Sequence, residues 1–232
     1  MDFIYKGFLI IYLDLLCSNK GRVIYMVEKK RIGVIGGTFN PIHLGHLMIA
    51  EVAREEFDLE MVLFIPSKIP PHKSEGVIPA EHRYAMTSAA VADNPYFKVS
   101  DIEMKREGFS YTIDTILDLK SEFGHDSEIY FIAGTDAIID LPNWKAIDKV
   151  LENCHFIGAI RPNGRDNQRA VEEAIALLGV KGTEKIHLLT VPEMKLSSTY
   201  LRERLQQGKS VRYMVPKLVA DYIESHDIYQ KE

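Results

Sequence analysis

The sequence of 232 residues has few of the features that mark metal centres, disulfide frameworks, membrane proteins or nucleic-acid-binding proteins. Its two cysteines, Cys17 and Cys154, belong to no C-x-x-C or Cys/His cluster, so neither a metal site nor a disulfide framework is predicted. The formal net charge is −5, whereas a nucleic-acid-binding domain usually carries a basic excess. We therefore expect a cytoplasmic protein without a nucleic-acid or membrane partner.

Residues 1–25 differ from the rest of the chain. The apolar stretch Phe3–Leu16 is interrupted by Asp14 and is too short to span a bilayer. It also lacks the basic segment and the small-residue cleavage site of a signal peptide. Codons for Lys20-Gly21-Arg22 can form a purine-rich ribosome-binding site shortly before Met26. Our hypothesis is that residues 1–25 are a non-native or disordered leader, translated from an upstream start.

Residues 26–232 have the length and the 46% hydrophobic content of a single globular domain. Apolar strand-like runs alternate with helical patterns, which predicts a parallel β-sheet covered by helices. Strands are expected at 32–35, 61–65, 97–99, 128–133, 154–160 and 186–190. Helices are expected at 44–57, 81–92 and 170–178, and a further helix is expected to end at Leu119. Residues 163–167 are expected to form a flexible loop. Residues 196–232 are expected to form a small C-terminal helical part that includes 213–226. The fold class is α/β, a Rossmann-like doubly wound sheet with a small C-terminal helical subdomain.

The most informative stretch is Arg31–Ala50, R-I-G-V-I-G-G-T-F-N-P-I-H-L-G-H-L-M-I-A. A buried strand ends at a glycine pair, and glycine lets the backbone turn sharply and approach a ligand. A helix that starts near Ile42 would carry His43 and His46 on one side of its first turn. Free N–H groups and the helix dipole favour an anion there. Taken separately, these histidines fit an ordinary surface turn better than a functional site.

A second signal lies in Leu196–Arg202, where three hydroxyl residues precede a helix and an arginine follows one turn later. Serine and threonine are common helix N-caps, so redundant capping is the simpler interpretation. The same helix start is also chemically suited to a triphosphate, because a guanidinium adds charge and paired hydrogen bonds to phosphate oxygens.

Three shorter segments fall at expected strand ends or helix starts. The run Ser67–Lys73 contains P-P-H-K after a strand, and Gly134-Thr135-Asp136 follows another. Such sheet edges bind ligands in doubly wound folds. Ser110 or Thr112 is expected to cap a helix, and Asp136 is equally compatible with a simple cap. The single tryptophan, Trp144, would on general grounds belong to the core.

Together these segments resemble one family. Arg31–Ala50 is similar to the G-G-T-F-D-P-x-H-x-G-H signature of the H-x-G-H nucleotidyltransferases, in particular the bacterial nicotinate-nucleotide adenylyltransferases. The resemblance extends to P-P-H-K, to an E-x-x-R-x-x-x-S-Y-T-x-D-T block from Glu103, to G-x-D…W, to Arg161-Pro162 and to I-S-S-T-x-I-R. Asn40 departs from the pattern, since the family usually has Asp there.

The resemblance implies adenylyl transfer from ATP to nicotinate mononucleotide, with Mg²⁺ carried by ATP. The catalytic residues are then His43, His46 and Arg202. The residues expected to bind ATP and its phosphates are Gly36, Gly37, Thr38, Phe39, Lys73, Gly134, Asp136, Ser197, Ser198 and Thr199. The residues expected to bind nicotinate mononucleotide are Ser110, Tyr111, Thr112, Ile113, Trp144 and Arg161, with Trp144 stacked on the pyridine ring.

Other functions are compatible with the same motifs. Adenylation of nicotinamide mononucleotide or phosphopantetheine, and cytidylyl transfer, use much the same H-x-G-H and S-S-T segments, and a catalytically silent nucleotide sensor is a further alternative. The choice of nicotinate mononucleotide depends on P-P-H-K, S-Y-T and Trp144 as a set. A homo-oligomer is compatible with the sequence, which does not specify an oligomeric state.

The leader hypothesis gives the first prediction. Protein isolated from its own host should begin at Met26, because translation would start after the purine-rich codons. N-terminal sequencing measures this directly, and an intact Met1 or Asp2 would contradict it.

Overall fold

The computed structural model describes residues 29–70, 76–160 and 165–230. The predicted leader, Lys73 and Arg161 lie outside these ranges. Six parallel strands form one sheet in the order β3-β2-β1-β4-β5-β6. The strands are β1 Arg31–Gly37, β2 Met61–Pro66, β3 Phe97–Val99, β4 Glu128–Gly134, β5 His155–Ile160 and β6 Ile186–Thr190. This confirms the predicted doubly wound α/β architecture.

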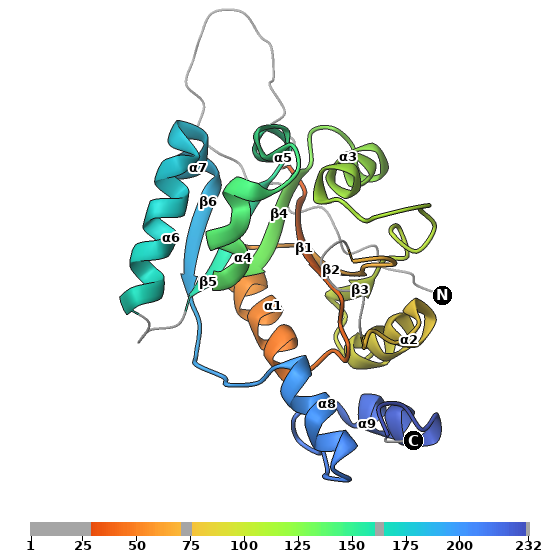
Figure 1. Ribbon diagram of the computed structural model, residues 1–232. Coiled ribbons are helices and arrows are strands. Elements are labelled where there is room, and N and C mark those ends of the chain that lie inside the picture. Colours follow the sequence, from red (N-terminus) through yellow and green to blue (C-terminus); the bar gives the residue numbers. More distant parts are fainter. Residues whose placement is uncertain (1–28, 71–75, 161–164, 231–232) are drawn as a thin grey trace, which may run out of the picture.

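Helices cover both faces of the sheet (Figure 1). They are α1 Leu44–Glu56, α2 Ala80–Val91, α3 Thr112–Phe123, α4 Thr135–Asp140, α5 Ile147–Asn153, α6 Arg165–Leu177, α7 Gly179–Lys185, α8 Ser198–Gln206 and α9 Lys217–Ser225, with a 3₁₀ turn at Leu141–Asn143. Successive residues of a strand point to opposite faces. In β2, Val62 and Phe64 therefore pack beneath α1 and α2, while Leu63 and Ile65 pack beneath α3.

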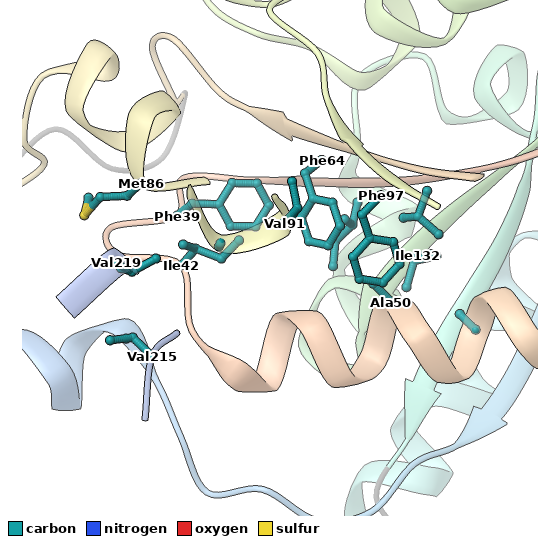
Figure 2. Packing of buried hydrophobic residues seen from close by; sticks show 14 of the residues in the cluster. Phe39, Ile42, Ala50, Phe64, Met86, Val91, Phe97, Ile132, Val215 and Val219 are labelled. Carbon is teal, nitrogen blue, oxygen red and sulfur yellow. The ribbon is translucent and has the colours of Figure 1, made fainter. Parts of the chain in front are cut away.

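The loop between β1 and α1, residues 38–43, is anchored in the first of these two cores. Phe39 is 3% exposed and Ile42 is fully buried. Figure 2 shows both side chains inside the cluster that also contains Phe64 of β2 and Val219 of α9. The loop that carries the sequence motif is thus packed as tightly as the sheet beneath it. Figure 1 shows α8 and α9 next to the start of α1.

Several predicted boundaries were wrong. Residues 165–167 belong to α6 and are not part of a flexible loop, and this helix ends at Leu177. The polar start of α6 resembles a loop, yet Val171 and Ala174 are buried one turn apart and anchor the helix. The short helices α4, α5 and α7 were not predicted. In the C-terminal part, α9 begins only after Pro216, later than the expected 213.

The predicted caps of α3 were also wrong. Tyr111 is the N-cap residue of α3 and makes no side-chain capping bond, so neither Ser110 nor Thr112 caps the helix. Instead, the Thr115 hydroxyl donates to Oε1 of the buried Glu103 at 2.7 Å. Arg106 also donates to the Thr115 hydroxyl, at 3.0 Å. This network connects the preceding loop to the first turn of α3 through longer-range contacts.

Candidate active site

The candidate site lies at the carboxyl edge of the sheet, where β1 and β4 are neighbours. The chain leaves β1 for α1 on one face of the sheet, and it leaves β4 for α4 on the other face. In doubly wound sheets, ligands bind at this reversal because the two departing loops separate and leave a crevice. The geometry therefore favours a ligand directly above the β1–α1 loop.

Two histidines lie at the start of α1. The helix begins at Leu44, so His43 is its N-cap residue and His46 lies in its first turn. Their rings stack with centroids 3.8 Å apart. The His43 backbone N–H donates to Nδ1 of His46 at 3.2 Å. In the ring tautomer that accepts this hydrogen bond on Nδ1, the proton is on Nε2, which is then a hydrogen-bond donor.

His43 is buried, with 6% of its surface exposed. Burial lowers the pKa of His43 to about 4, so the ring is neutral at physiological pH. Its Nδ1 atom has no hydrogen-bond partner among the described residues. Gly45 allows this placement, because a Cβ atom at residue 45 would approach Nδ1 of His43 to 3.0 Å. A side chain at residue 45 would therefore require the His43 ring to shift.

Arg83 of α2 holds the β1–α1 loop from below. The guanidinium is 1% exposed and donates to the carbonyl oxygens of Thr38 at 2.8 Å, Lys68 at 3.0 Å and Ile78 at 3.1 Å. Burial lowers the pKa of Arg83 from its ordinary value, and arginine nevertheless stays charged in proteins. None of the ion pairs among the described residues includes Arg83. A buried positive charge thus lies directly behind Thr38.

Helix α8 contacts the same loop from the side. Ser197 is its N-cap, and the Ser197 hydroxyl accepts a hydrogen bond from the Tyr200 backbone N–H at 3.2 Å. The Ser198 hydroxyl donates to the Pro41 carbonyl at 2.8 Å. Arg202 donates to the Asn40 carbonyl at 2.8 Å and to the Thr199 hydroxyl at 3.2 Å. The two sequence motifs, about 160 residues apart, are thereby brought into direct contact.

The described residues among those expected to bind the mononucleotide form a separate group, with Trp144 packed against Phe131 of β4. Lys145 lies over the Tyr111 ring, with Nζ 3.7 Å from the ring centroid, which places the start of α3 near the segment that contains Trp144. The Trp144 ring is half-buried and contacts Phe131 and Phe156 edge-on. The indole therefore packs on the core, as the sequence predicts on general grounds.

The remaining expected residues vary in their accessibility. Gly36 and Gly37 end β1 and are half-buried, and Gly134 and Asp136 are exposed at the start of α4. Ile113 is buried in the core beneath α3, so its side chain cannot reach a ligand and only its backbone can. Lys73 and Arg161 are not among the described residues.

The comparisons with known proteins identify the family. A sequence model described as cytidylyltransferase-like matches residues 34–204. A probable nicotinate-nucleotide adenylyltransferase from Moorella thermoacetica is 48% identical over 86% of this chain and 92% of its own. The chain belongs to the nicotinate-nucleotide adenylyltransferase family. A second relative with the same description, from a Thermoanaerobacter species, is 43% identical over 89% of this chain and 98% of its own.

The fold of this chain is also that of solved structures. The nicotinic acid mononucleotide adenylyltransferase of Plasmodium falciparum, complexed with NaAD, has a TM-score of 0.69 at 20% identity. The alignment covers 86% of this chain and 97% of that protein. The same Plasmodium enzyme complexed with APC has a TM-score of 0.68 at 19% identity. At these identities the likeness concerns the fold alone.

Arg83 is the main residue of the candidate site that sequence reasoning missed. The sequence pattern assigns it to the start of a helix and gives no reason to bury it. The available signal is the spacing of the apolar residues that follow it, because Met86 and Ala90 lie on the same side of α2 and are buried. That spacing points Arg83 inward as well.

We predict that Arg83→Lys lowers the free energy of unfolding by about 2–4 kcal/mol, because one ammonium group cannot reach all three carbonyls and each buried carbonyl left unpaired costs about 1–3 kcal/mol. Urea unfolding followed by circular dichroism measures this. Arg169→Lys is the matched control, since Arg169 is exposed and pairs only with Glu173. Equal stability of the Arg83→Lys variant and the wild type would show that the three bonds do not hold the loop.

Proposed function

We propose that this chain transfers the adenylyl group of ATP to nicotinate mononucleotide, giving nicotinate adenine dinucleotide and pyrophosphate, a step of NAD biosynthesis. A phosphate oxygen of the mononucleotide attacks the α-phosphorus of ATP. A new P–O bond forms as the bond from the α-phosphorus to the bridging oxygen breaks, and the electron pair leaves with pyrophosphate. The attacking phosphate is already ionised, so the reaction needs no protein nucleophile and no covalent intermediate.

The observation that carries this proposal is the stacked histidine pair at the start of α1, at the end of a loop that the buried Arg83 and helix α8 both hold. Such a site presents N–H donors and positive charge to a polyanion without a carboxylate base. Transfer of a phosphoryl-type group mainly requires alignment and stabilisation of charge in the transition state. The arrangement therefore suits adenylyl transfer better than acyl transfer or hydrolysis.

We assign the groups as follows. His43 and His46 would serve the α- and β-phosphates, as donors that follow the charge developing there. Ser198, Thr199 and Arg202 would bind the outer phosphates and the leaving pyrophosphate, together with Lys73. A guanidinium has five N–H donors, and Arg202 uses two of them in the bonds described above.

We assign Mg²⁺ to the nucleotide and not to a protein site. Among the described residues, no group of three or more His, Cys, Asp or Glu is placed to hold a metal ion. This suits an ion held mainly by phosphates and water, as is usual for Mg²⁺. Bound in this way, the ion would neutralise charge on the phosphates while the protein aligns them.

The choice of the second substrate is supported by the group around Tyr111 and Trp144. The first turn of α3 offers backbone N–H groups to a carboxylate, and the nicotinate ring would lie between it and Trp144. Both substrates are soluble phosphorylated metabolites, so we place the reaction in the cytoplasm. In the described part of the chain, none of the helices has the length and apolar character needed to cross a membrane.

A substrate panel tests the proposed function. Purified protein is incubated with ATP, Mg²⁺ and one of three acceptors: nicotinate mononucleotide, nicotinamide mononucleotide or phosphopantetheine. CTP with a phosphorylated alcohol is a fourth arm. We predict that pyrophosphate release is fastest with nicotinate mononucleotide, because only its carboxylate matches the start of α3. Faster release with another acceptor would reassign the substrate, and ATP binding without release in any arm would indicate a nucleotide sensor.

We further predict that His46→Ala lowers kcat on the order of a hundredfold, as the loss of one oxyanion-type donor does. Steady-state kinetics with saturating ATP and nicotinate mononucleotide measure the change. His125→Ala is the matched control, since His125 is exposed in the turn before β4, at the opposite edge of the sheet. Near-normal turnover of the His46→Ala variant would remove this histidine from the mechanism.

A further inference from the structure

The chain's C-terminal end reaches the β1–α1 loop. The Tyr229 hydroxyl donates to Oδ1 of Asn40 at 2.6 Å, across 189 positions of sequence. Tyr229 follows α9, and its backbone adopts a left-handed conformation with φ of 66°. The preceding Ile228 is buried in the same core as Phe39. The contact is thus made by an anchored segment of the chain.

Asn40 is 5% exposed, and both ends of its side-chain amide and its own carbonyl form hydrogen bonds in this contact region. Its Nδ2 atom donates to the Gly76 carbonyl at 2.8 Å, and Oδ1 also lies 3.5 Å from the Ile78 backbone N–H. Its own carbonyl accepts the hydrogen bond from Arg202. One amide therefore joins three separate segments: the β1–α1 loop, the end of the loop that leads into α2, and the C-terminus.

The contacts of this side chain match an amide, which has both a donor and an acceptor. The Gly76 carbonyl needs a donor, whereas the Tyr229 hydroxyl needs an acceptor. An aspartate, the residue that the family usually has here, would supply acceptors only. It would bring a carboxylate oxygen against the carbonyl oxygen of Gly76, at a site where unpaired polar groups are costly. The Tyr229 contact and the amide at residue 40 thus belong to one arrangement.

We propose that the Tyr229 hydroxyl is a positioning group for the reaction: through Asn40 it fixes the β1–α1 loop in the conformation that directs His43 and His46 at the phosphates. Burial raises the pKa of Tyr229, so the hydroxyl keeps the proton that it donates. The loop has no regular secondary structure of its own between Thr38 and His43. Its conformation therefore depends on such side-chain contacts. This inference rests on the proposed function for its kinetic consequence.

The test is Tyr229→Phe, with Tyr222→Phe as the matched control. Both changes remove one C-terminal hydroxyl, but the Tyr222 hydroxyl lies 3.0 Å from Nδ1 of His82 on α2, away from the loop. We predict that Tyr229→Phe lowers kcat by roughly three- to tenfold, the effect of one lost hydrogen bond. The KM values should stay within about twofold, because the loss falls on the transition state. The control should keep the wild-type kcat.

Two further measurements separate positioning from a general loss of stability. In a double-mutant cycle, kcat of Tyr229→Phe combined with Asn40→Ala should equal that of Asn40→Ala alone, since both act through one bond. Amide hydrogen exchange of the substrate-free protein should be faster at Leu44, whose N–H donates to the Met214 carbonyl at 3.1 Å, in Tyr229→Phe but not in the control.

The outcomes are distinguishable. An unchanged kcat in Tyr229→Phe, an equal loss in Tyr222→Phe, or additive losses in the cycle would each overturn the proposal. If the wild-type protein releases no pyrophosphate with any acceptor, the proposed function fails, and the hydrogen-exchange comparison alone then decides whether Tyr229 positions the loop.

Discussion

The site depends on one costly interaction, the burial of Arg83 beneath the β1–α1 loop. A guanidinium without an acidic partner is expensive to remove from water, and carbonyl oxygens only partly compensate for it. Three carbonyls from separate segments nevertheless converge on this group. Neutral side chains, and lysine with its compact ammonium, cannot satisfy carbonyls that lie in such different directions, whereas the planar fork of arginine can. The positive charge remains close to the place where the phosphates would bind.

These contacts make the β1–α1 loop a part of the core. Phe39 and Ile42 pack in the same cluster as Val215 and Val219 near the C-terminus (Figure 2). A group that stabilises a transition state must be held to within a fraction of an ångström. Here a loop without regular secondary structure gains that precision from both sides, through buried apolar contacts below and hydrogen bonds from α8 above. The C-terminal helices thereby contact the β1–α1 loop directly.

Local sequence patterns predicted most of the strands and helices, but few of the contacts between segments that lie far apart in the sequence. The buried strands, the Ser197 cap and the helix after His43 follow from short apolar runs, a hydroxyl before a helix and a glycine turn. The N-cap of α3 and the start of α6 did not follow from local patterns. At α3 the bond between Thr115 and Glu103 overrides the local preference, and at α6 the packing of Val171 in the core does so. Arg83 bonds Thr38 from 45 positions away. No periodicity within a window of one helix contains that information.

The role of Asn40 becomes clear only when the sequence and the structure are considered together. The sequence alone shows a departure from the family pattern and leaves its meaning open, since asparagine and aspartate both suit a turn. The structure shows that both ends of the amide are used, one as a donor and one as an acceptor. A substitution that looks conservative in a loop therefore changes which segments the loop can join. In this chain the departure at residue 40 and the tyrosine near the C-terminus are explained by a single hydrogen-bonded arrangement.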